Sequence, residues 1–528
     1  MWKITCAPAW SIPLYELRLN ANFYAAVAAA SVRRSEQVLL ETDDGRFYTR
    51  GDMFRESARL AGVLCDAGAV RGDRIAVQVD KSPAALFLYL ACLRAGLVYL
   101  PLNTAYQRSE LAYFLQDARP KVVVCRPTSL TLLRELAAGK AEIFTLDHEG
   151  CGSLTDAAAT LADEFKTVDC AADDLAVIIY TSGTTGRAKG AMVTHRNLLS
   201  NSSVLVDYWE FSDRDVLLHA LPVFHIHGLF VANHCALLSG AKLLWHRKFD
   251  SVLVLRDLAR ATVMMGVPTF YTRLLAHPGF DREACQGMRL FISGSAPLQP
   301  ETFREFKRRS GQSILERYGM SEAGMICSNP LHRERRAGSV GLPLPGVSLR
   351  IAGEDDHPVA QGLAGSIQIK GENVFAGYWD NPDKTRLEFT EDGYFRTGDI
   401  GVFDGDGYVS IVGRAKDVII SGGYNVYPKE IELLIDALPG VMESAVIGIP
   451  HPDLGEAVTA VLVPKHGALL DPEAMMAELK NNLANYKVPK QIHVVDELPR
   501  NAMGKVQKAS LRERYGGATP GVIGGTVN

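Results

Sequence analysis

Short apolar runs alternate with stretches of helical periodicity through the first three quarters of the chain. Several runs are short and bounded by turn residues, which predicts strands; they span residues 74–79, 121–125, 175–180, 215–221 and 289–294. Some of them are apolar on both faces, as is typical of central parallel strands that helices cover. Helices are predicted over residues 82–96 and 301–311. The alternation predicts an α/β fold whose large N-terminal domain has layered, mostly parallel sheets with helices.

The pattern changes after Val340. Glycines then separate short alternating segments such as GYFRTGD and GYVSIVGR, which predicts a small β region of antiparallel strands. From Asp417 onward the sequence predicts a compact, small α+β domain. Its expected elements are a strand at 417–421, a helix at 427–440 with Pro428 in the first turn, a strand pair at 444–450 and 457–464, and a helix at 471–483.

These patterns divide the chain into four regions. Residues 1–18 form an N-terminal extension of unknown role, residues 19–415 the large domain, and residues 416–515 the C-terminal domain. Residues 516–528 are rich in glycine and are predicted to be disordered.

Composition and charge exclude several classes of protein. The chain has 528 residues, of which 47% are hydrophobic and 22% charged, as expected of a globular protein with a large core. Its net charge of -4 gives no basic excess, so we expect no nucleic-acid partner. The longest apolar stretch, residues 82–100, is interrupted by Arg94 and predicts a buried helix, not a membrane span.

The cysteines point to a reducing compartment. There are nine, an odd number, and no two have C-x-x-C spacing, so neither a disulfide framework nor a zinc site is predicted. The first residues contain no long apolar segment of the kind that a secretory signal needs. We therefore predict a cytoplasmic protein without a membrane partner. The sequence does not predict its oligomeric state.

The stretch IIYTSGTTGRAKGAM, residues 178–192, has the composition of a phosphate-binding loop. It follows a buried strand and combines hydroxyls, flexible glycines and a cation, all of which suit an anion. The expected phosphate ligands are Thr181, Ser182, Gly183, Thr184, Thr185, Gly186 and Lys189. Its spacing differs from that of the common G-x-x-x-x-G-K loop. The alternative is an ordinary polar loop after a strand.

The segment YTSGTTGRAKG resembles the phosphate loop of the adenylate-forming superfamily, which includes acyl-CoA synthetases, luciferases and the adenylation domains of peptide synthetases. In that superfamily the loop binds the β- and γ-phosphates of ATP, which leave as pyrophosphate. The usual form has proline before the lysine, where this chain has Ala188. The resemblance implies that this loop binds ATP, and the departure concerns the stiffness of the loop.

Two further motifs imply nucleotide-binding residues in the large domain. FISGSAPL, residues 291–298, resembles the loop on the adenine side and implies Gly294, Ser295 and Ala296. ERYGMSE, residues 316–322, resembles the YGxTE motif with serine in place of threonine. It implies a nucleotide site formed by Glu316, Arg317, Tyr318, Gly319, Met320 and Ser321, and a Mg²⁺ site formed by Glu322 with Thr184.

Four motifs imply functional residues toward the C-terminus. YFRTGD supplies Asp399 for the ribose hydroxyls, and GRAKD supplies Arg414 near the ribose and Lys416 as a hinge. SGGYNVYPKEIE resembles the glycine turn beside the pantetheine channel, at Gly422 and Gly423. PRNAMGKVQK supplies Lys505, which matches the catalytic lysine of the superfamily. Seven motifs thus follow one another in the order of the superfamily.

The implied chemistry has two steps. A carboxylate attacks the α-phosphorus of ATP, and Lys505 supplies positive charge between the two anions. Mg²⁺ neutralises the pyrophosphate that leaves. The thiol of CoA then takes the acyl group from AMP. The resemblance implies that the mobile C-terminal domain swings about Lys416, so that one pose presents Lys505 and the other the glycine turn.

The acid is indicated by HIHG, residues 225–228, and by VPTFYTRLL, residues 267–275, which look closest to malonyl-CoA synthetases. His225 and His227 are the implied substrate residues; no third ligand at a metal spacing accompanies them. A diacid would bury a second carboxylate, which requires a cation, and arginine suits it. Arg273 is the first candidate and Arg289 the second.

Several readings of the function stay open. The leading one is an acyl-CoA ligase that uses ATP, Mg²⁺ and CoA to activate malonate or methylmalonate. The small apolar residues 323–327 could admit a methyl branch or a different acid. Another short-chain or aromatic acyl-CoA ligase is the enzymatic alternative. A nucleotide-sensing protein without activity is the alternative of another class, although Lys505, Glu322 and Asp399 are all present.

Overall fold

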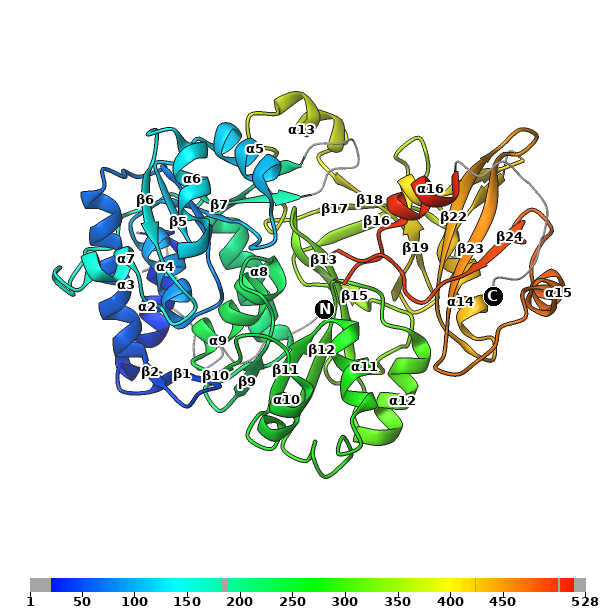
Figure 1. Ribbon diagram of the computed structural model, residues 1–528, viewed down its shortest axis with the longest axis horizontal. Coiled ribbons are helices and arrows are strands. Elements are labelled where there is room, and N and C mark those ends of the chain that lie inside the picture. Colours follow the sequence, from blue (N-terminus) through cyan, green and yellow to red (C-terminus); the bar gives the residue numbers. More distant parts are fainter. Residues whose placement is uncertain (1–19, 182–187, 423, 502–503, 517–528) are drawn as a thin grey trace, which may run out of the picture. The chain divides into compact units, whose positions relative to one another are not determined.

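The computed structural model describes residues 20–181, 188–422, 424–501 and 504–516 (Figure 1). The chain divides into two compact units. One comprises Met1–Leu349 and Ile369–Phe395, and the other Arg350–Gln368 and Arg396–Asn528. The predicted α/β class, with a large N-terminal part and a smaller C-terminal part, is confirmed. The domain boundary at residues 415–416, which was placed at a hinge, stays a prediction.

A nine-stranded sheet forms one half of the first unit. Its strand order is β15-β14-β13-β12-β11-β9-β10-β1-β2. The six strands from β13 to β1 in this order are parallel, so their carboxyl ends meet at one edge of the sheet. The strands are β1 (Val38–Thr42), β2 (Phe47–Thr49), β9 (Val216–His219), β10 (Lys242–Trp245), β11 (Val263–Gly266), β12 (Leu290–Ser293), β13 (Leu315–Met320), β14 (Gly324–Ser328) and β15 (Leu342–Pro343).

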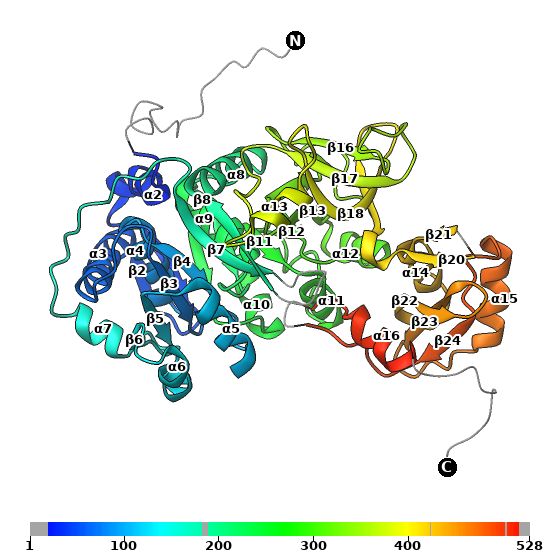
Figure 2. The same ribbon diagram turned by 90° about the horizontal axis from the view of Figure 1, so that it is seen from above.

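A six-stranded sheet forms the other half, with the order β6-β5-β3-β4-β7-β8. Its strands are β3 (Arg74–Gln78), β4 (Val98–Pro101), β5 (Val122–Cys125), β6 (Glu142–Thr145), β7 (Leu175–Thr181) and β8 (Lys189–Thr194). All neighbours are parallel except β7 and β8, which form an antiparallel hairpin. Figure 2 shows α6 beside the β5–β6 edge of this sheet, where it contacts both strands.

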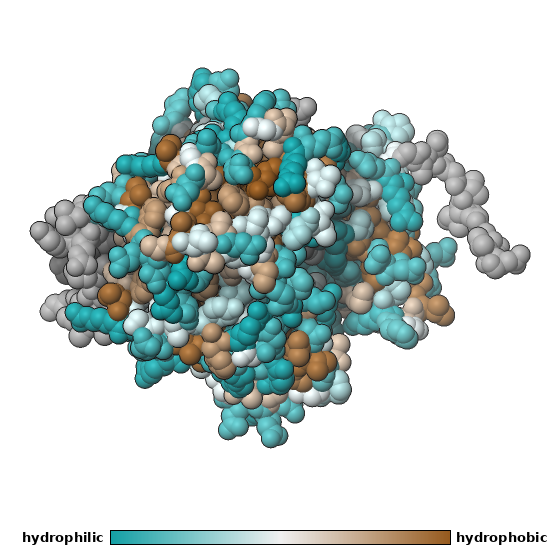
Figure 3. Space-filling model, turned by 60° about the vertical axis from the view of Figure 1, so that its left-hand side comes forward, coloured by the Kyte–Doolittle hydropathy of each residue, from teal (hydrophilic) through white to brown (hydrophobic). Residues whose placement is uncertain are grey.

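Helix α4 (Pro83–Arg94) is buried along nearly its whole length within the main hydrophobic core. Ser82 caps its first turn by accepting a hydrogen bond from the backbone N–H of Ala85, and Pro83 occupies a position where no N–H is needed. The buried helix predicted within the apolar stretch 82–100 is therefore confirmed, but the end of that stretch forms β4, a strand that was not predicted. Among the described residues no helix is long and apolar enough to cross a membrane. On the face shown in Figure 3, hydrophobic side chains are interspersed with hydrophilic ones.

The remaining helices of the first unit cover the sheets. They are α2 (Phe23–Ser31), η1 (Val32–Arg34), α3 (Arg50–Asp66), α5 (Arg108–Ala118), η2 (Pro127–Ser129), α6 (Leu130–Ala137), α7 (Ser153–Ala158), α8 (His195–Tyr208), the π-helical η3 (His227–Ala232), α9 (Asn233–Ser239), α10 (Ser251–Leu258), α11 (Pro268–Ala276), α12 (Pro300–Ser310) and α13 (Pro382–Glu388). The predicted helices 82–96 and 301–311 correspond to α4 and α12 and are confirmed.

Two smaller sheets belong mainly to the second unit. A four-stranded sheet joins β16 (Ser348–Ala352), β17 (Gly365–Lys370), β18 (Phe395–Phe403) and β19 (Val409–Arg414). A five-stranded sheet joins β20 (Ile419–Ser421), β21 (Tyr424–Val426), β22 (Val441–His451), β23 (Gly455–Pro464) and β24 (Gln491–Val494). The connecting helices are η4 (Ala415–Asp417), α14 (Pro428–Asp436), α15 (Pro472–Asn482) and α16 (Lys508–Gly516). The predicted strand pair is confirmed as β22 with β23, which are antiparallel.

Candidate active site

The stem of the predicted phosphate loop is the β7–β8 hairpin. Thr181 pairs with Lys189 at its open end, so the two ends of the loop lie side by side. The loop residues Ser182, Gly183, Thr184, Thr185 and Gly186 lie outside the described residues. The fold therefore brings together the residues at the two ends of the motif, Thr181 with its hydroxyl and Lys189 with its ammonium group.

Glu322 lies in the turn of the β13–β14 hairpin and is 6% exposed. The Thr181 hydroxyl donates to Glu322 Oε1 at 3.0 Å, and the Tyr378 hydroxyl donates to the same oxygen at 3.4 Å. Burial, together with the nearby Glu322 charge, raises the pKa of Tyr378, which keeps it a donor. The structure thus brings the Thr181 end of the loop and the ERYGMSE motif together, as two motifs of one nucleotide site require.

Lys189 lies beside the same group of residues. Its Nζ is 3.8 Å from Glu388 Oε1 and 5.0 Å from the centre of the Tyr378 ring. Lys384 also reaches Glu388, at 2.6 Å. Burial, followed by the charge of Lys384, lowers the pKa of Lys189. The loop cation is therefore held by an internal carboxylate.

The segment Gly294, Ser295 and Ala296 follows the carboxyl end of β12, the edge at which parallel sheets bind ligands. A Cβ atom on Gly294 would lie 2.4 Å from Cζ of Arg317, so only glycine leaves room for that guanidinium. Ser295 has φ +71°, an uncommon conformation that often marks a functional site. Glu316 Oε1 accepts a hydrogen bond from Leu298 N–H at 2.9 Å and so ties the two motifs together.

Arg317 is a buried cation next to this segment. It is 3% exposed, and its Nε and Nη2 atoms have no hydrogen-bond partner among the described residues. Burial lowers the pKa of Arg317 to about 9, so the side chain is still charged at neutral pH. A buried charge without a partner is costly. The site is therefore built for an anion that would pair with this guanidinium.

His227 completes the surroundings of Arg317. It begins the π-helical η3, is fully buried, and has its Nδ1 3.2 Å from Ser295 Oγ. Burial, followed by the Arg317 charge, lowers the pKa of His227, so the imidazole is neutral at physiological pH. The half-buried His225 accepts a hydrogen bond from His227 N–H at its Nδ1, at 3.3 Å. The two histidines are thus brought together, and His227 also meets Ser295.

Ser293 is a candidate residue that sequence reasoning missed. It ends β12, is fully buried, and its Oγ has no hydrogen-bond partner within the described part of the chain. Its only signal in the sequence is a serine at the end of an apolar strand, which is too common to identify a site. It is thus a further buried polar group without a partner among the described residues at the carboxyl edge of the sheet.

The two arginines that the sequence predicts for the second carboxylate do not lie beside Gly294 and His227, where Arg317 lies. Arg273 is exposed on α11, whose buried face carries Tyr271 and Leu274. Arg289 precedes β12, at the opposite end of that strand from Gly294, and donates to both oxygens of Asp215 at 2.7 and 2.8 Å. An exposed side chain and one with an internal carboxylate partner are poorly suited to meet a buried anion. Sequence reasoning had assigned the better-placed Arg317 to the nucleotide.

Within the second unit, Asp399 on β18 and Arg414 on β19 are neighbours in register. Arg414 Nε is 3.0 Å from Asp399 Oδ1, and Asp399 is 3% exposed. Lys416 is exposed in η4, where the adjacent Asp417 forms an ion pair with Arg512 at 2.8 Å. The residues implied for ribose binding are thus brought together.

The other predicted positions of this unit are Gly422, Gly423 and Lys505. Gly422 has φ +59° and donates its N–H to Leu454 O at 2.8 Å, whereas Gly423 lies outside the described residues. Lys505 is exposed and follows Gly504, whose φ is +74°. The side chain of Asn501 accepts a hydrogen bond from Lys505 N–H at 3.0 Å. The backbone of Lys505 is therefore hydrogen-bonded to Asn501.

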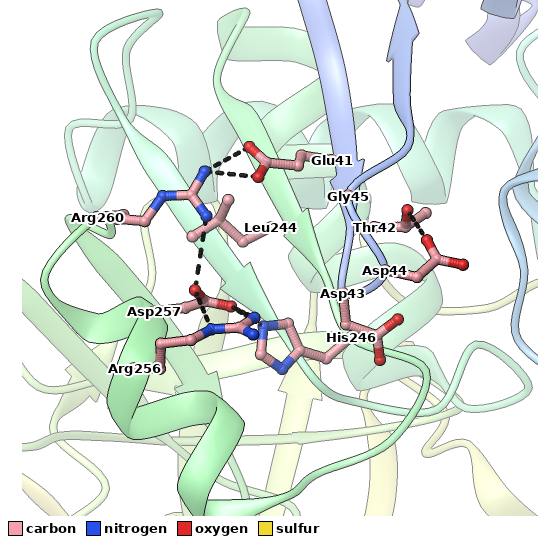
Figure 4. Close-up of a pocket in the computed structure, with 10 residues that line it drawn as sticks. All are labelled: Glu41, Thr42, Asp43, Asp44, Gly45, Leu244, His246, Arg256, Asp257 and Arg260. Atoms are coloured by element: carbon pink, nitrogen blue, oxygen red, sulfur yellow. Dashed lines mark hydrogen bonds and ion pairs between the residues drawn. The ribbon is translucent and has the colours of Figure 1, made fainter.

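A cavity of about 420 Å³ lies away from these motifs, at the ends of β1 and β10 (Figure 4). Two ion pairs lie in its lining: Arg260 with Glu41 at 2.6 Å, and Arg256 with Asp257 at 2.8 Å. Its two arginines thus already have carboxylate partners, unlike Nε and Nη2 of Arg317, which have none among the described residues. A second cavity, of only about 30 Å³, is lined by Glu322, Gly324 and Ile226 among others.

Comparison with known proteins follows the same division of the chain. The AMP-binding enzyme family matches residues 27–379, and the AMP-binding enzyme C-terminal domain matches residues 430–505. ATP-bound MatB from Rhodopseudomonas palustris has 52% sequence identity and a TM-score of 0.93, with 94% of this chain and 99% of that chain covered. A feruloyl-CoA synthase of an Amycolatopsis species is 38% identical over 89% of this chain and 95% of its own. The mitochondrial malonate–CoA ligase of Bos taurus is 34% identical over 91% and 89%.

Proposed function

The chain belongs to the AMP-binding enzyme family, in which it is an acyl-CoA ligase, and we propose that the acid it activates is malonate or methylmalonate. The family match confirms the membership that the sequence motifs predicted. The substrates are therefore a small carboxylic acid, ATP and CoA. One carboxylate of the acid attacks the α-phosphorus of ATP and releases pyrophosphate. The CoA thiol then attacks the acyl carbon and releases AMP.

The observation that carries the choice of acid is the buried guanidinium of Arg317. Malonate has a second carboxylate that takes no part in the reaction and must be buried with it. Arginine can bind such a group through two parallel hydrogen bonds, and Nε and Nη2 form the edge that does so. We assign the second carboxylate to Arg317 in place of Arg273 and Arg289.

The neighbours of Arg317 support the same assignment. His227 is buried and its Nε2 has no partner among the described residues, and Ser295 Oγ lies 3.2 Å from His227 Nδ1. A neutral His227 can donate or accept a hydrogen bond without adding a second charge. These groups would satisfy the oxygen atoms that the guanidinium leaves unpaired. The second carboxylate would thus be paired and hydrogen-bonded, as a buried charge must be.

We further propose that the loop stem and the hairpin tip bind ATP with Mg²⁺. Mg²⁺ prefers oxygen ligands and is usually held by one or two carboxylates together with substrate phosphates. Glu322, with the Thr181 hydroxyl beside it, fits this preference. Within the described residues no group of three or more acidic, histidine or cysteine side chains could hold a metal alone. Mg²⁺ would neutralise the phosphates, while Lys189 would bind the pyrophosphate that leaves.

The remaining predicted roles are part of the same proposal. Asp399 and Arg414 would bind the ribose, Lys416 would be the hinge, and Lys505 would supply the charge for adenylate formation. The Gly422 turn would serve the CoA step. The absence of a C-x-x-C pair supports a cytoplasmic location.

An aromatic acid is the second candidate, because a feruloyl-CoA synthase is among the relatives. Ferulate has no second carboxylate, so its binding would leave Arg317 buried and unpaired. Malonate is therefore better supported.

Methylmalonate differs from malonate by only one additional methyl group. The small residues at Ala323 and Gly324 and the cavity of about 30 Å³ beside Gly324 favour its admission.

The test is pyrophosphate release by the purified protein with ATP, Mg²⁺ and CoA. The panel of acids is malonate, methylmalonate, butyrate, benzoate and ferulate, each measured as kcat/KM. We expect malonate or methylmalonate to exceed the three monocarboxylic acids by about 30-fold or more, the effect of one buried charged hydrogen bond. Preference for ferulate or benzoate would contradict the choice of acid while leaving the ligase activity intact.

A further inference from the structure

The stem of the phosphate loop departs from the usual form of the superfamily at one backbone position. Ala188 stands where proline usually precedes the lysine. Proline fixes φ near -65°, which reduces the conformational entropy that a loop loses when it becomes ordered. Alanine gives no such restriction. The backbone at Ala188, directly before Lys189, must therefore be restrained in another way if the loop is to bind phosphate as well as a loop with proline does.

Helix α5 lies beside the end of the β7–β8 hairpin and supplies a contact to this position (Figure 1). The Tyr113 hydroxyl donates to the backbone oxygen of Ala188 at 2.9 Å. Tyr113 and Ala188 are 75 positions apart in the chain, so the contact depends on the tertiary fold. It acts on the peptide group that joins Ala188 to Lys189.

The same helix also holds the other arm of the hairpin. Asp117, one helical turn after Tyr113, accepts a hydrogen bond from the Tyr180 hydroxyl. Burial, together with this hydrogen bond, raises the pKa of Tyr180, so its hydroxyl remains a donor. The backbone oxygen of Asp117 accepts from the Trp379 indole at 3.2 Å, and Trp379 N–H donates to Gly190 O at 2.8 Å. Both arms of the loop stem are thereby connected to α5.

Ring packing makes this support rigid. The Tyr180 ring lies 4.4 Å from the ring of Phe114 and 6.1 Å from that of Tyr113, edge to face in the second case. Tyr180 is 7% exposed, and Ala188 packs against the same apolar cluster. Aromatic pairs at these distances restrict one another in orientation. The Tyr113 hydroxyl is therefore positioned in advance and need not be ordered when a ligand binds.

We infer that Tyr113 is a positioning residue for the phosphate loop, and that its hydrogen bond to the Ala188 carbonyl takes over the restriction that proline gives elsewhere in the superfamily. The inference rests on the proposed role of this loop in ATP binding. Tyr113 itself need not touch the nucleotide. Its hydrogen bond restrains the peptide group between Ala188 and Lys189. This restraint fixes the direction in which the Lys189 side chain points.

The first test is Tyr113→Phe, which removes only the hydroxyl. We expect the KM for ATP to rise about 3- to 10-fold, the range that the loss of one neutral hydrogen bond supports. The KM values for the acid and for CoA should change by less than about twofold, because Tyr113 is proposed to act only on the ATP loop. Twofold is about the scatter expected between independent sites. Tyr106→Phe is the matched control, because the Tyr106 ring packs on Phe114 in the same cluster and its hydroxyl does not hold the stem.

The second test asks whether proline can replace the hydrogen bond. Ala188→Pro keeps the carbonyl group and adds the restriction on φ. In the Ala188→Pro background, we expect Tyr113→Phe to raise the KM for ATP by less than about twofold, a clear departure from additivity. An equal rise in both backgrounds would overturn the inference. So would a common rise in the KM values for ATP, acid and CoA, which would show a general loss of structure.

Calorimetric titration of ATP without acid separates this inference from the proposed function. If the wild-type protein fails to bind ATP, the proposed role of the loop is wrong. If the wild-type protein binds ATP and Tyr113→Phe binds it equally well, only the inference about Tyr113 is wrong. We expect the wild-type protein and Tyr106→Phe to bind alike, and Tyr113→Phe to bind about 3- to 10-fold more weakly.

Discussion

Two sides of the candidate active site differ in how their polar groups are satisfied. On the nucleotide side, Thr181 donates to Glu322, and Lys189 faces Glu388. On the acid side, Arg317 and His227 are buried, and each has at least one polar atom without a hydrogen-bond partner in the described ranges. Because buried polar groups are almost always paired, the second arrangement indicates that a ligand completes it.

The difference teaches where selectivity for the acid resides. On the nucleotide side, the polar groups pair with other groups of the protein. This side is proposed to bind ATP, which is the same whichever acid is activated. The acid side contains a fixed positive charge, which in our proposal distinguishes diacids from monocarboxylic acids. Substitutions on the first side should therefore lower the rate for every acid alike, whereas substitutions around Arg317 should change the ratio between acids.

The largest effect is expected for Lys505→Ala, which should impair adenylate formation, the step that all acids share. Removing a preorganised cation from the developing charge should slow adenylate formation by about 10²–10³-fold, for malonate and butyrate alike. Transfer from premade acyl-adenylate to CoA should change much less. Both half-reactions can be followed by single-turnover measurements. Equal losses in the two would contradict separate roles. Lys490→Ala, at another exposed lysine of the second unit, is the control.

Glu322→Gln should have the next largest effect and sharpen the comparison. The amide oxygen can still accept the hydrogen bond from Thr181, but the charge that suits Mg²⁺ is lost. We expect kcat/KM to fall by about 100-fold with every acid and the Mg²⁺ concentration for half-maximal rate to rise. The ratio between malonate and butyrate should stay the same. A changed ratio would place Glu322 on the acid side.

Arg289→Met should have the smallest effect on catalysis. Arg289 pairs with the buried Asp215, and its removal leaves that carboxylate with fewer donors. We expect the free energy of unfolding in urea to fall by about 1–3 kcal/mol, while the ratio of malonate to butyrate activity is unchanged. If instead malonate activity alone is lost, our assignment of the second carboxylate to Arg317 is wrong.

The fold could be predicted from sequence wherever periodicity and burial coincide. The strand run 175–180 is found as β7 (Leu175–Thr181), and the buried helix 82–96 as α4 (Pro83–Arg94). Boundaries were less accurate where a polar residue has a tertiary role. The run 215–221 forms a strand only over Val216–His219, and Asp215 at its start accepts hydrogen bonds from Arg289 and Thr262. Such a partner cannot be seen in the local pattern.

The site could be predicted only as a set of motifs. Motif order identifies the residues, but it does not show which of them lack a partner in the folded chain. Arg317 was assigned to the nucleotide because it stands in ERYGMSE. Its significance depends on burial in β13 and on the space beside Gly294, which are tertiary properties. Two charged residues, Glu316 and Arg317, within a strand that follows the apolar residues Ile314 and Leu315 are the one signal in the sequence that could have marked it.

The central claim, that Arg317 is the charge that selects a diacid, is tested most directly by Arg317→Met. The specificity constants for malonate and butyrate are measured in this variant, in the wild-type protein and in Arg273→Met, the same change at an exposed position. We predict that Arg317→Met lowers kcat/KM for malonate by about 30-fold to several-thousand-fold relative to butyrate, and that Arg273→Met does not. The ligand-free variant should unfold at no lower temperature, since an unpaired buried charge is removed. An unchanged ratio of the two acids, in a folded Arg317→Met protein, would contradict the claim.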